Sequence, residues 1–155
     1  MPAPERAQRD ISRLLNEAGH VLSNRLAAAL AEIDLTPRTQ CVLVHALEEE
    51  RTQIQLAALA GVDKTTMVST VDEMERRGLA ERRPAASDRR ARIIAVTEAG
   101  RRLAEEGQRI VDRVHGEALA AFDPARRDAF IDLLTELAGA ISPTGPQPIR
   151  RPRGR

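Results

Sequence analysis

The amino-acid sequence predicts a mainly α-helical protein that carries one small β-hairpin. Three observations support this fold class. Apolar residues recur at helical spacing through most of the chain, two short helical patterns meet at Gly61, and an arginine-rich turn separates two strand-like runs. The apolar residues are mostly small and aliphatic, with two Phe and neither Trp nor Tyr, and such side chains pack well between helices.

The first predicted helix is long and amphipathic, and it runs from about Glu5 to Ile33. Its apolar residues recur every three or four positions, and only Gly19 weakens the pattern. A second helix is expected from Pro37 to about Glu49, because the Thr36 hydroxyl can cap it and Pro37 needs no hydrogen bond at the first helical position. The residues that this second helix is expected to bury are Val42 or Leu43, Val44 and Leu47.

The next two helices are short and meet at a glycine. Thr52 can cap a helix from Gln53 to Ala60 that ends at Gly61, and Asp63 can cap a helix from Lys64 to Arg77 that ends at Gly78. We expect their buried residues to be Ile54, Leu56, Ala57, Leu59, Met67, Val71 and Met74. A small residue at the crossing point, a glycine in the turn and apolar residues that pack back are the requirements of a helix-turn-helix.

Two short strands are expected after these helices, from Ala80 to Arg83 and from Arg92 to Val96. The residues from Pro84 to Asp88 are typical of the tip of a hairpin. A hairpin directly after a helix-turn-helix forms a wing, so the central part of the chain is predicted to be a winged helix-turn-helix.

Two further helices complete the predicted fold. One begins at Thr97 and Glu98 and continues to about Phe122, with Gly107 and Gly116 as points of weakness where it can bend. The other begins at Asp123-Pro124, and its apolar face consists of Phe130, Leu133, Leu134, Leu137 and Ile141. Residues 143–155 hold four arginines, no acids and much proline and glycine, which predicts a disordered basic tail.

The charge is concentrated in the predicted wing. The whole chain has a net charge of only +1, but seven arginines lie between Arg76 and Arg92 against two acids. Arginines at a wing tip suit the narrow minor groove of DNA, where Asp88 would orient Arg90 through a charge-assisted hydrogen bond. The alternative for this run is an ordinary solvated charged loop.

Several classes of protein are excluded by what the sequence lacks. A single cysteine allows no intrachain disulfide and favours the cytoplasm, and no stretch has the ~20 apolar residues that cross a bilayer. No phosphate-binding loop, nucleophile motif or metal-ligand spacing is present, and the run Glu48-Glu49-Glu50 is interpreted as a solvated helix end. We therefore expect no enzyme activity, no cofactor, no metal site and no membrane partner.

Three stretches together resemble the MarR family (multiple antibiotic resistance regulators). They are LTPRTQCVLVHAL, LAALAGVDKTTMVSTVDEMERRGLAERR and SDRRARIIAVTEAGRRL, and the resemblance covers about Leu35 to Leu103. It implies a winged-helix homodimer in which the first and last helices of both chains intertwine. It also implies binding to a pseudo-palindromic operator in double-stranded DNA, commonly as a repressor that a small ligand releases.

The resemblance also implies a division of the chain. Residues 1–35 would form an N-terminal dimerisation helix, residues 36–97 the DNA-binding lobe, residues 98–142 the C-terminal dimerisation helices and residues 143–155 the basic tail. Carried over by position, the residues that contact DNA are Lys64, Thr65, Val68 and Ser69 in the major groove, with Arg89, Arg90 and Arg92 on the wing. The family commonly has threonine at the position of Val68 and arginine at that of Ser69, so the operator sequence is open and the wing would carry a larger share of the affinity.

Four residues are candidates for contacts with an effector: Arg25, His20, Cys41 and His45. On a helical wheel Arg25 falls near the centre of an apolar stripe, where a charge is costly unless it is paired. It would either form an ion pair with Glu32 or with an acid of a partner chain, or anchor a small anionic effector. Cys41 is interpreted as a small buried cysteine, with redox sensing as the alternative.

A second function belongs to a different class. Asp72, Glu73 and Glu75 on the predicted recognition helix have no evident partner in the sequence, and acids there would favour a winged-helix module that binds another protein without reading DNA. Binding to duplex DNA that weakens steeply with salt separates the two functions.

Overall fold

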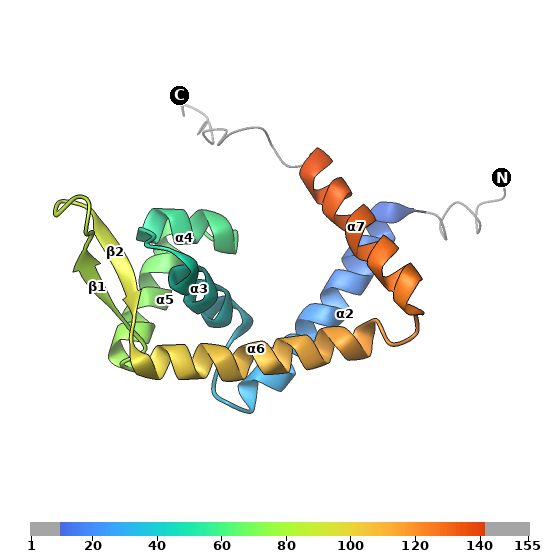
Figure 1. The fold of residues 1–155 in the computed structure, drawn as a ribbon, viewed down its shortest axis with the longest axis horizontal. Coiled ribbons are helices and arrows are strands. Elements are labelled where there is room, and N and C mark those ends of the chain that lie inside the picture. The colour runs from blue at the N-terminus through green and yellow to red at the C-terminus, as the bar shows by residue number, and fades with distance from the viewer. Residues whose placement is uncertain (1–9, 142–155) are drawn as a thin grey trace, which may run out of the picture. The chain divides into compact units, whose positions relative to one another are not determined.

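A computed structural model of the chain describes residues 10–141 (Figure 1). In this range six helices and one two-stranded antiparallel sheet follow one another in the predicted order. The mainly α-helical fold with a β-hairpin wing is confirmed. The chain divides into two compact units between residues 117 and 118, and each unit is described separately.

The first helix, α2 (Ile11–Ala31), begins later than predicted. Asp10 is extended and its carboxylate accepts a hydrogen bond from the backbone N–H of Arg13, so a helix that continues through Asp10 is wrong; residues 1–9 lie outside the described range. Only the C-terminal end of α2 joins the core, where Leu30 is 1% exposed. Apolar side chains nearer its start are open to solvent, namely Ile11, Leu14, Leu15 and Val21.

Helix α3 (Pro37–Glu48) lies at the centre of the core. The predicted cap is confirmed, because the Thr36 hydroxyl accepts from the Thr39 N–H at 3.1 Å and Pro37 opens the helix. Val42 and Leu43 are almost fully buried, whereas Val44 and Leu47 are half-buried. The buried Gln40 donates from Nε2 to the carbonyl of Ala104 at 2.9 Å, which ties α3 to a helix 64 residues further on.

Helices α4 (Gln53–Ala60) and α5 (Lys64–Arg76) form the predicted helix-turn-helix. Gly61 has φ 64° between them and Gly78 has φ 68° after α5, and both are left-handed positions that favour glycine. Met67, Val71 and Met74 are fully buried, as predicted. The inward orientation predicted for Ile54 and Leu59 is wrong, because only one side of this two-turn helix meets the core and Leu56 and Ala57 occupy it.

The wing consists of β1 (Ala80–Pro84) and β2 (Arg92–Val96), which pair antiparallel with Ala80 opposite Val96 and Pro84 opposite Arg92. The connection between α3 and α4 pairs with β2 on its other side. The Ile94 N–H donates to the Arg51 carbonyl at 3.0 Å, and Thr52 forms an antiparallel β-bridge with Ile93. The hairpin is thereby fixed to the helical core along β2.

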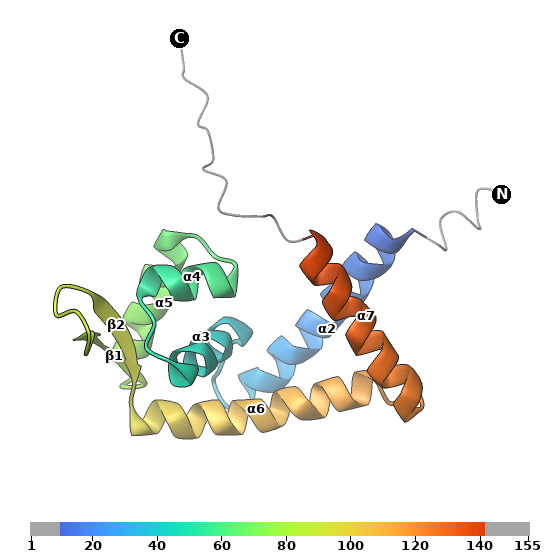
Figure 2. The same cartoon turned by 45° about the horizontal axis from the view of Figure 1, so that its top comes forward.

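Helix α6 (Glu98–Ala118) ends a turn earlier than the predicted Phe122, and Figure 2 shows it as one unbroken helix. The bend expected at Gly107 is absent (Figure 2). Gly107 is buried against Gln40 and Leu35, so its missing side chain is what allows α3 and α6 to approach each other. In the same way, the missing side chain of Gly100 allows α6 to approach the backbone carbonyl of Leu79.

The second unit contains α7 (Pro124–Ile141). Its start is confirmed, because Asp123 accepts from the Arg126 N–H at 3.0 Å. Phe122 and Phe130 stack at 5.9 Å between ring centroids, and the Arg126 guanidinium lies over the Phe122 ring. The apolar face of α7 is largely open to solvent within one chain, with Leu133 65% and Ile141 68% exposed. The predicted basic tail lies outside the described residues.

Candidate nucleic-acid interface

The N-terminus of α5 is open and polar. Lys64 and Thr65 are exposed in its first turn, directly after Asp63. The Asp63 carboxylate accepts from the Thr66 N–H at 2.7 Å and from the Thr66 hydroxyl at 3.1 Å, and these hydrogen bonds lower the pKa of Asp63. The remaining free N–H groups of this turn and the Lys64 ammonium make this helix end electropositive and open to solvent.

The cap gives a pH-dependent prediction. The folded pKa of Asp63 is depressed, so its contribution to stability is complete above the unfolded pKa of about 4 and is lost as pH falls through the lower folded pKa. Asp63→Ala should lower the melting temperature at pH 7, and the difference from the wild-type protein should shrink in this acidic window. Asp63→Asn keeps an acceptor oxygen and should show a smaller difference at pH 7, and because only the wild-type carboxyl titrates, this difference should change over the same acidic window, as measured by circular dichroism. A difference for Asp63→Ala that is constant from pH 7 to pH 3 would contradict the assignment.

Further along the same face, Val68 is half-buried and Ser69 is exposed. The Ser69 hydroxyl donates to the carbonyl of Thr66 at 2.9 Å, so its proton is used inside the helix. The Ser69 hydroxyl can then only accept a hydrogen bond, and the neighbouring Val68 side chain offers only methyl groups. The centre of this face therefore offers few donors to a base edge.

The tip of the wing exposes Arg89, Arg90 and Arg92. The predicted hydrogen bond between Asp88 and Arg90 is present at 2.9 Å, but the donor is the backbone N–H of Arg90. The Asp88 carbonyl also accepts from the Ala91 N–H at 3.0 Å. Asp88 thus shapes the loop and leaves the guanidinium of Arg90 extended into solvent.

The other four arginines between Arg76 and Arg92 are paired with acids. Their ion pairs are Arg76 with Glu73, Arg77 with Asp34, Arg82 with Asp72 and Glu75, and Arg83 with Glu81. The prediction that Asp72, Glu73 and Glu75 are unpaired is therefore wrong. Within residues 10–141 no ion pair compensates the three wing-tip arginines, so the positive charge available to a partner is concentrated there.

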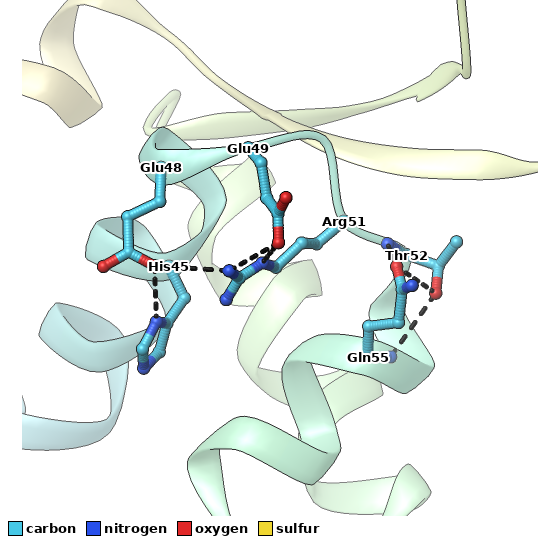
Figure 3. A network of polar contacts seen from close by, with 6 residues as sticks. All are labelled: His45, Glu48, Glu49, Arg51, Thr52 and Gln55. Carbon is cyan, nitrogen blue, oxygen red and sulfur yellow. Dashed lines mark hydrogen bonds and ion pairs between the residues drawn. The ribbon is translucent and has the colours of Figure 1, made fainter. Parts of the chain in front are cut away.

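A second polar cluster lies where α3 meets the wing (Figure 3). Arg51, whose side chain is 14% exposed, pairs with Glu49 at 2.7 Å and Glu48 at 3.3 Å. His45 bonds Glu48 at 3.0 Å, and this hydrogen bond, followed by the charge of His45 and then that of Arg51, lowers the pKa of Glu48. Glu50 accepts from the N–H of Ala86, in the loop that joins β1 and β2, at 3.4 Å. The acidic run is an exposed helix end, as predicted, and its ion pairs with Arg51 also place it at the junction between α3 and the hairpin.

A pocket of about 220 Å³ lies among α2, α3 and α6. His45 and Cys41 line it, together with Leu26, Leu30, Pro37, Gln40, Val44, Gln108 and Val111. The buried Oε1 of Gln40 has no hydrogen-bond partner among the described residues. That oxygen lies against Gly107 in the contact between α3 and α6, so the pocket itself is mainly apolar.

The four candidate effector residues do not all meet there. Cys41 is half-buried rather than buried, and burial raises the pKa of its thiol, which disfavours the reactive thiolate. His20 lies outside the pocket and contacts Asn24 at 3.2 Å. Arg25 is exposed and forms no ion pair with Glu32 or any other described residue, so the buried position predicted for it is wrong within one chain. The helical wheel could not show that α2 has no covering element at this point.

An open recognition helix beside a basic hairpin defines the winged-helix DNA-binding regulators. A MarR family model matches residues 33–91. CouR from Rhodococcus jostii RHA1, solved with p-coumaroyl-CoA, is 34% identical with a TM-score of 0.78, over 90% of this chain and 97% of that one. A MarR-family transcriptional regulator from Rhodococcus sp. RHA1 is also 34% identical, with a TM-score of 0.77, over 84% and 94%.

A third structure, the transcriptional repressor CouR bound to a 23-mer DNA duplex, is 25% identical with a TM-score of 0.77 over 89% of this chain and 98% of that one. The chain belongs to the MarR family, and it is a DNA-binding transcriptional regulator. The resemblance noted in the sequence is thereby confirmed. No helix in the described range is long and apolar enough to span a bilayer.

Proposed function

We propose that this regulator acts in the cytoplasm as a repressor, binds a pseudo-palindromic operator as a homodimer and leaves it when a small effector binds. The observation that carries the proposal is the pairing of an open α5 N-terminus with three uncompensated arginines at the wing tip. A CouR repressor of the same fold has been solved on a DNA duplex.

In this proposal the two parts of the interface have different roles. Lys64 and Thr65 contact phosphates or base edges at the entrance of the major groove, and Val68 packs on a thymine methyl. Arg89, Arg90 and Arg92 reach the neighbouring minor groove, where the negative potential attracts guanidinium groups. Ser69 contributes little to base discrimination because its proton is already donated to Thr66.

The dimer is supported by two apolar faces that one chain leaves open, on α2 and on α7. Exposed apolar surface of this extent is unusual in a monomer and marks an association surface. We therefore propose the division into dimerisation helices at residues 1–35 and 98–142, a DNA-binding lobe at residues 36–97 and a basic tail at residues 143–155. Truncation after Ile141 should leave the dimer intact and reduce only non-specific, salt-sensitive affinity.

The effector site that we propose is the pocket among α2, α3 and α6. Its mainly apolar wall suits an apolar ligand, and His45 and Cys41 line the same space. Arg25 and His20 lie outside it, so any contact that they make is with an anionic part of the effector beyond the pocket. The relative solved with p-coumaroyl-CoA makes that thioester the first probe to test.

Footprinting of the purified protein on genomic DNA tests the proposed function. We expect one protected region with two half-sites one helical turn or a multiple of it apart, and an affinity that falls steeply with salt. Binding of equal strength to random duplexes would contradict a sequence-specific repressor. Full affinity at every concentration of p-coumaroyl-CoA would exclude this thioester as the effector, and Arg25→Ala with unchanged release would exclude a contact at Arg25.

Filling the pocket should separate effector response from DNA binding. Cys41→Phe places a ring in the pocket, so the concentration of p-coumaroyl-CoA that releases half of the operator should rise by about tenfold, equivalent to ~1.4 kcal/mol. The operator Kd should change little, because Cys41 belongs neither to α5 nor to the wing. Cys41→Ser is the matched control and should respond like the wild-type protein. Equal loss of response in both variants would instead implicate the thiol.

A further inference from the structure

We infer that Arg82 is a positioning residue that locks the wing to the recognition helix and so fixes the spacing between the two DNA-contacting parts. The inference rests on the proposed function, since a fixed spacing matters only if α5 and the wing engage the same duplex. It assigns to Arg82 a role in binding that requires no contact with DNA.

Arg82 lies on β1 and bonds to two helices at once. Its Nη2 donates to Asp72 Oδ1 at 2.7 Å and to Gln53 Oε1 at 3.1 Å, while Nη1 donates to Glu75 Oε2. The backbone N–H of Arg82 donates to the other oxygen of Glu75 at 2.8 Å. Glu75 therefore holds both the main chain and the side chain of the same residue. The clamp, defined as Arg82, Asp72, Glu75 and Gln53, joins β1, α5 and α4.

The clamp spans the connection between the recognition helix and the wing. Between the end of α5 at Arg76 and the start of β1 at Ala80, the backbone passes through Gly78 with φ 68°. The connection is held by backbone hydrogen bonds from the Leu79 N–H to the Met74 carbonyl at 2.8 Å and from the Thr97 N–H to the Leu79 carbonyl at 3.0 Å. Contacts from Asp72 and Glu75 before this connection to Arg82 after it add a side-chain restraint on the direction of β1.

The geometry of arginine is suited to this function. A planar guanidinium presents several donors in a fixed fork, so pairing with two carboxylates and an amide restricts its orientation. The Arg82 side chain is 29% exposed and Glu75 is 34% exposed, so solvent screens these pairs only in part. With its donors directed at the clamp, Arg82 is not presented to phosphates as Arg89 and Arg90 are.

The consequence for binding is preorganisation. If α5 and the wing keep a fixed spacing, the second contact with DNA forms without a further loss of conformational freedom. If the wing moves independently, each binding event must order it again. Loss of the clamp should therefore weaken operator binding although no DNA-contacting group is removed.

The first test compares Arg82→Met with Arg83→Met in the full chain. Arg83 is its neighbour on β1, has a 63% exposed side chain and pairs only with Glu81 among the described residues, so it provides a control with the same change in charge and composition. We expect Arg82→Met to weaken operator affinity by about tenfold or more and Arg83→Met to change it by less than about threefold. The slope of log affinity against log salt should be unchanged in Arg82→Met; a slope reduced by about 0.9 per arginine would show that Arg82 contacts phosphate and overturn the inference.

The second test measures the wing directly and without DNA. A nitroxide label on Ser87→Cys, in a Cys41→Ser background, should become more mobile in Arg82→Met and stay unchanged in Arg83→Met. Unchanged mobility in Arg82→Met would overturn the clamp even if affinity fell. Because this readout needs no operator, it tests the clamp separately: failure of the wild-type protein to bind any operator would contradict only the proposed function.

Two further variants separate the clamp from a simple effect of charge. The combination Arg82→Met, Asp72→Asn and Glu75→Gln removes the unpaired carboxylates left near DNA, so recovery of full affinity would show that Arg82 only neutralises acids and would overturn the inference. Arg82→Lys keeps the charge and loses the fork, and we expect it to remain weak with a mobile wing. If Arg82→Met does not fold by circular dichroism, Arg82→Lys decides, and wild-type affinity with an immobile label in that variant overturns the clamp.

Discussion

Replacing Arg89 and Arg90 together with alanine is expected to weaken operator binding by about 100-fold or more at physiological salt. Both side chains are exposed and have no acidic partner in the described part of the chain, whereas Arg76 at the end of α5 and Arg82 on β1 are compensated. Each charge-assisted contact contributes about 1.5–3 kcal/mol, and the pair is lost from both protomers of a dimer. Titration of a labelled operator by fluorescence anisotropy measures the change.

The salt dependence gives a second and independent readout of the same variant. Each phosphate contact adds about 0.9 to the slope of log affinity against log salt, so loss of four arginines per dimer should reduce the slope by up to about 3–4. A smaller reduction with the same loss of affinity is expected if the side chains act inside the minor groove as proposed, and the full reduction would place them on phosphates.

A matched change of charge controls for the overall field of the protein. Arg109 and Arg113 are exposed on α6, and Arg109→Ala with Arg113→Ala changes the net charge by the same amount. We expect this variant to bind within about threefold of the wild-type protein, because exposed charges far from the duplex are largely screened. Comparable losses in both double variants would contradict a specific role of the wing tip.

Much of the fold could be predicted because its signals are local. Thr36-Pro37, Gly61 and Gly78 each act on a single helix end, and all three positions can be identified from neighbouring residues alone. The buried seam of Met67, Val71 and Met74 follows directly from helical periodicity. The positions of the hairpin follow in the same way from β-branched residues and turn residues.

The charges of the candidate site could not be predicted in this way. The sequence shows seven arginines within seventeen positions, but it does not show which acids face them after folding. Arg82 meets Asp72 and Glu75 only because β1 folds back along α5, and the pairing changes the interpretation of all three residues. A count of charges therefore overstates the basic surface and also overstates the free acids of the recognition helix.

Helical wheels fail where one side of a helix has no neighbour. The wheel predicts that Arg25 on α2 and Ile54 on α4 face the core, and both are exposed in one chain. A wheel gives the relative direction of side chains around a helix, but the covering element decides which of them are buried. Among the described residues of one chain, no element covers Arg25 or Ile54.

The sequence also misleads about glycines in helices. The loss of helix propensity at a glycine is a local effect, whereas the close packing that the glycine permits depends on a distant part of the chain. Gly107 weakens α6 by propensity, yet a Cβ there would lie 2.7 Å from Leu35 Cδ2 and would also displace the Gln40 side chain that bonds Ala104. A sequence shows the cost, ~1 kcal/mol relative to alanine. The benefit requires knowledge of which helix crosses at that point.

Gly100→Ala is expected to show most clearly that close packing at a glycine can outweigh its poor helix propensity. A Cβ at Gly100 would overlap the backbone carbonyl oxygen of Leu79 and lie 2.7 Å from Val96 Cγ1, and a backbone atom cannot move aside as a flexible side chain can. Leu79 is held in place, because its carbonyl accepts from the Thr97 N–H at 3.0 Å. We expect the free energy of unfolding to fall by about 3 kcal/mol or more, the upper range for overpacking.

Gly116→Ala in the same helix is the matched control, because nothing lies within 4 Å of the added Cβ. Helix propensity alone then acts, and the free energy of unfolding should rise by up to ~1 kcal/mol. Both values come from urea unfolding at one protein concentration, since a dimer's stability depends on concentration. The chemical change is the same in both variants, and only the neighbours of the new methyl group differ. A loss of stability in Gly100→Ala with a gain in Gly116→Ala would therefore demonstrate the close approach of α6 to Leu79. Equal stabilisation by the two substitutions would show that this close approach does not exist in solution.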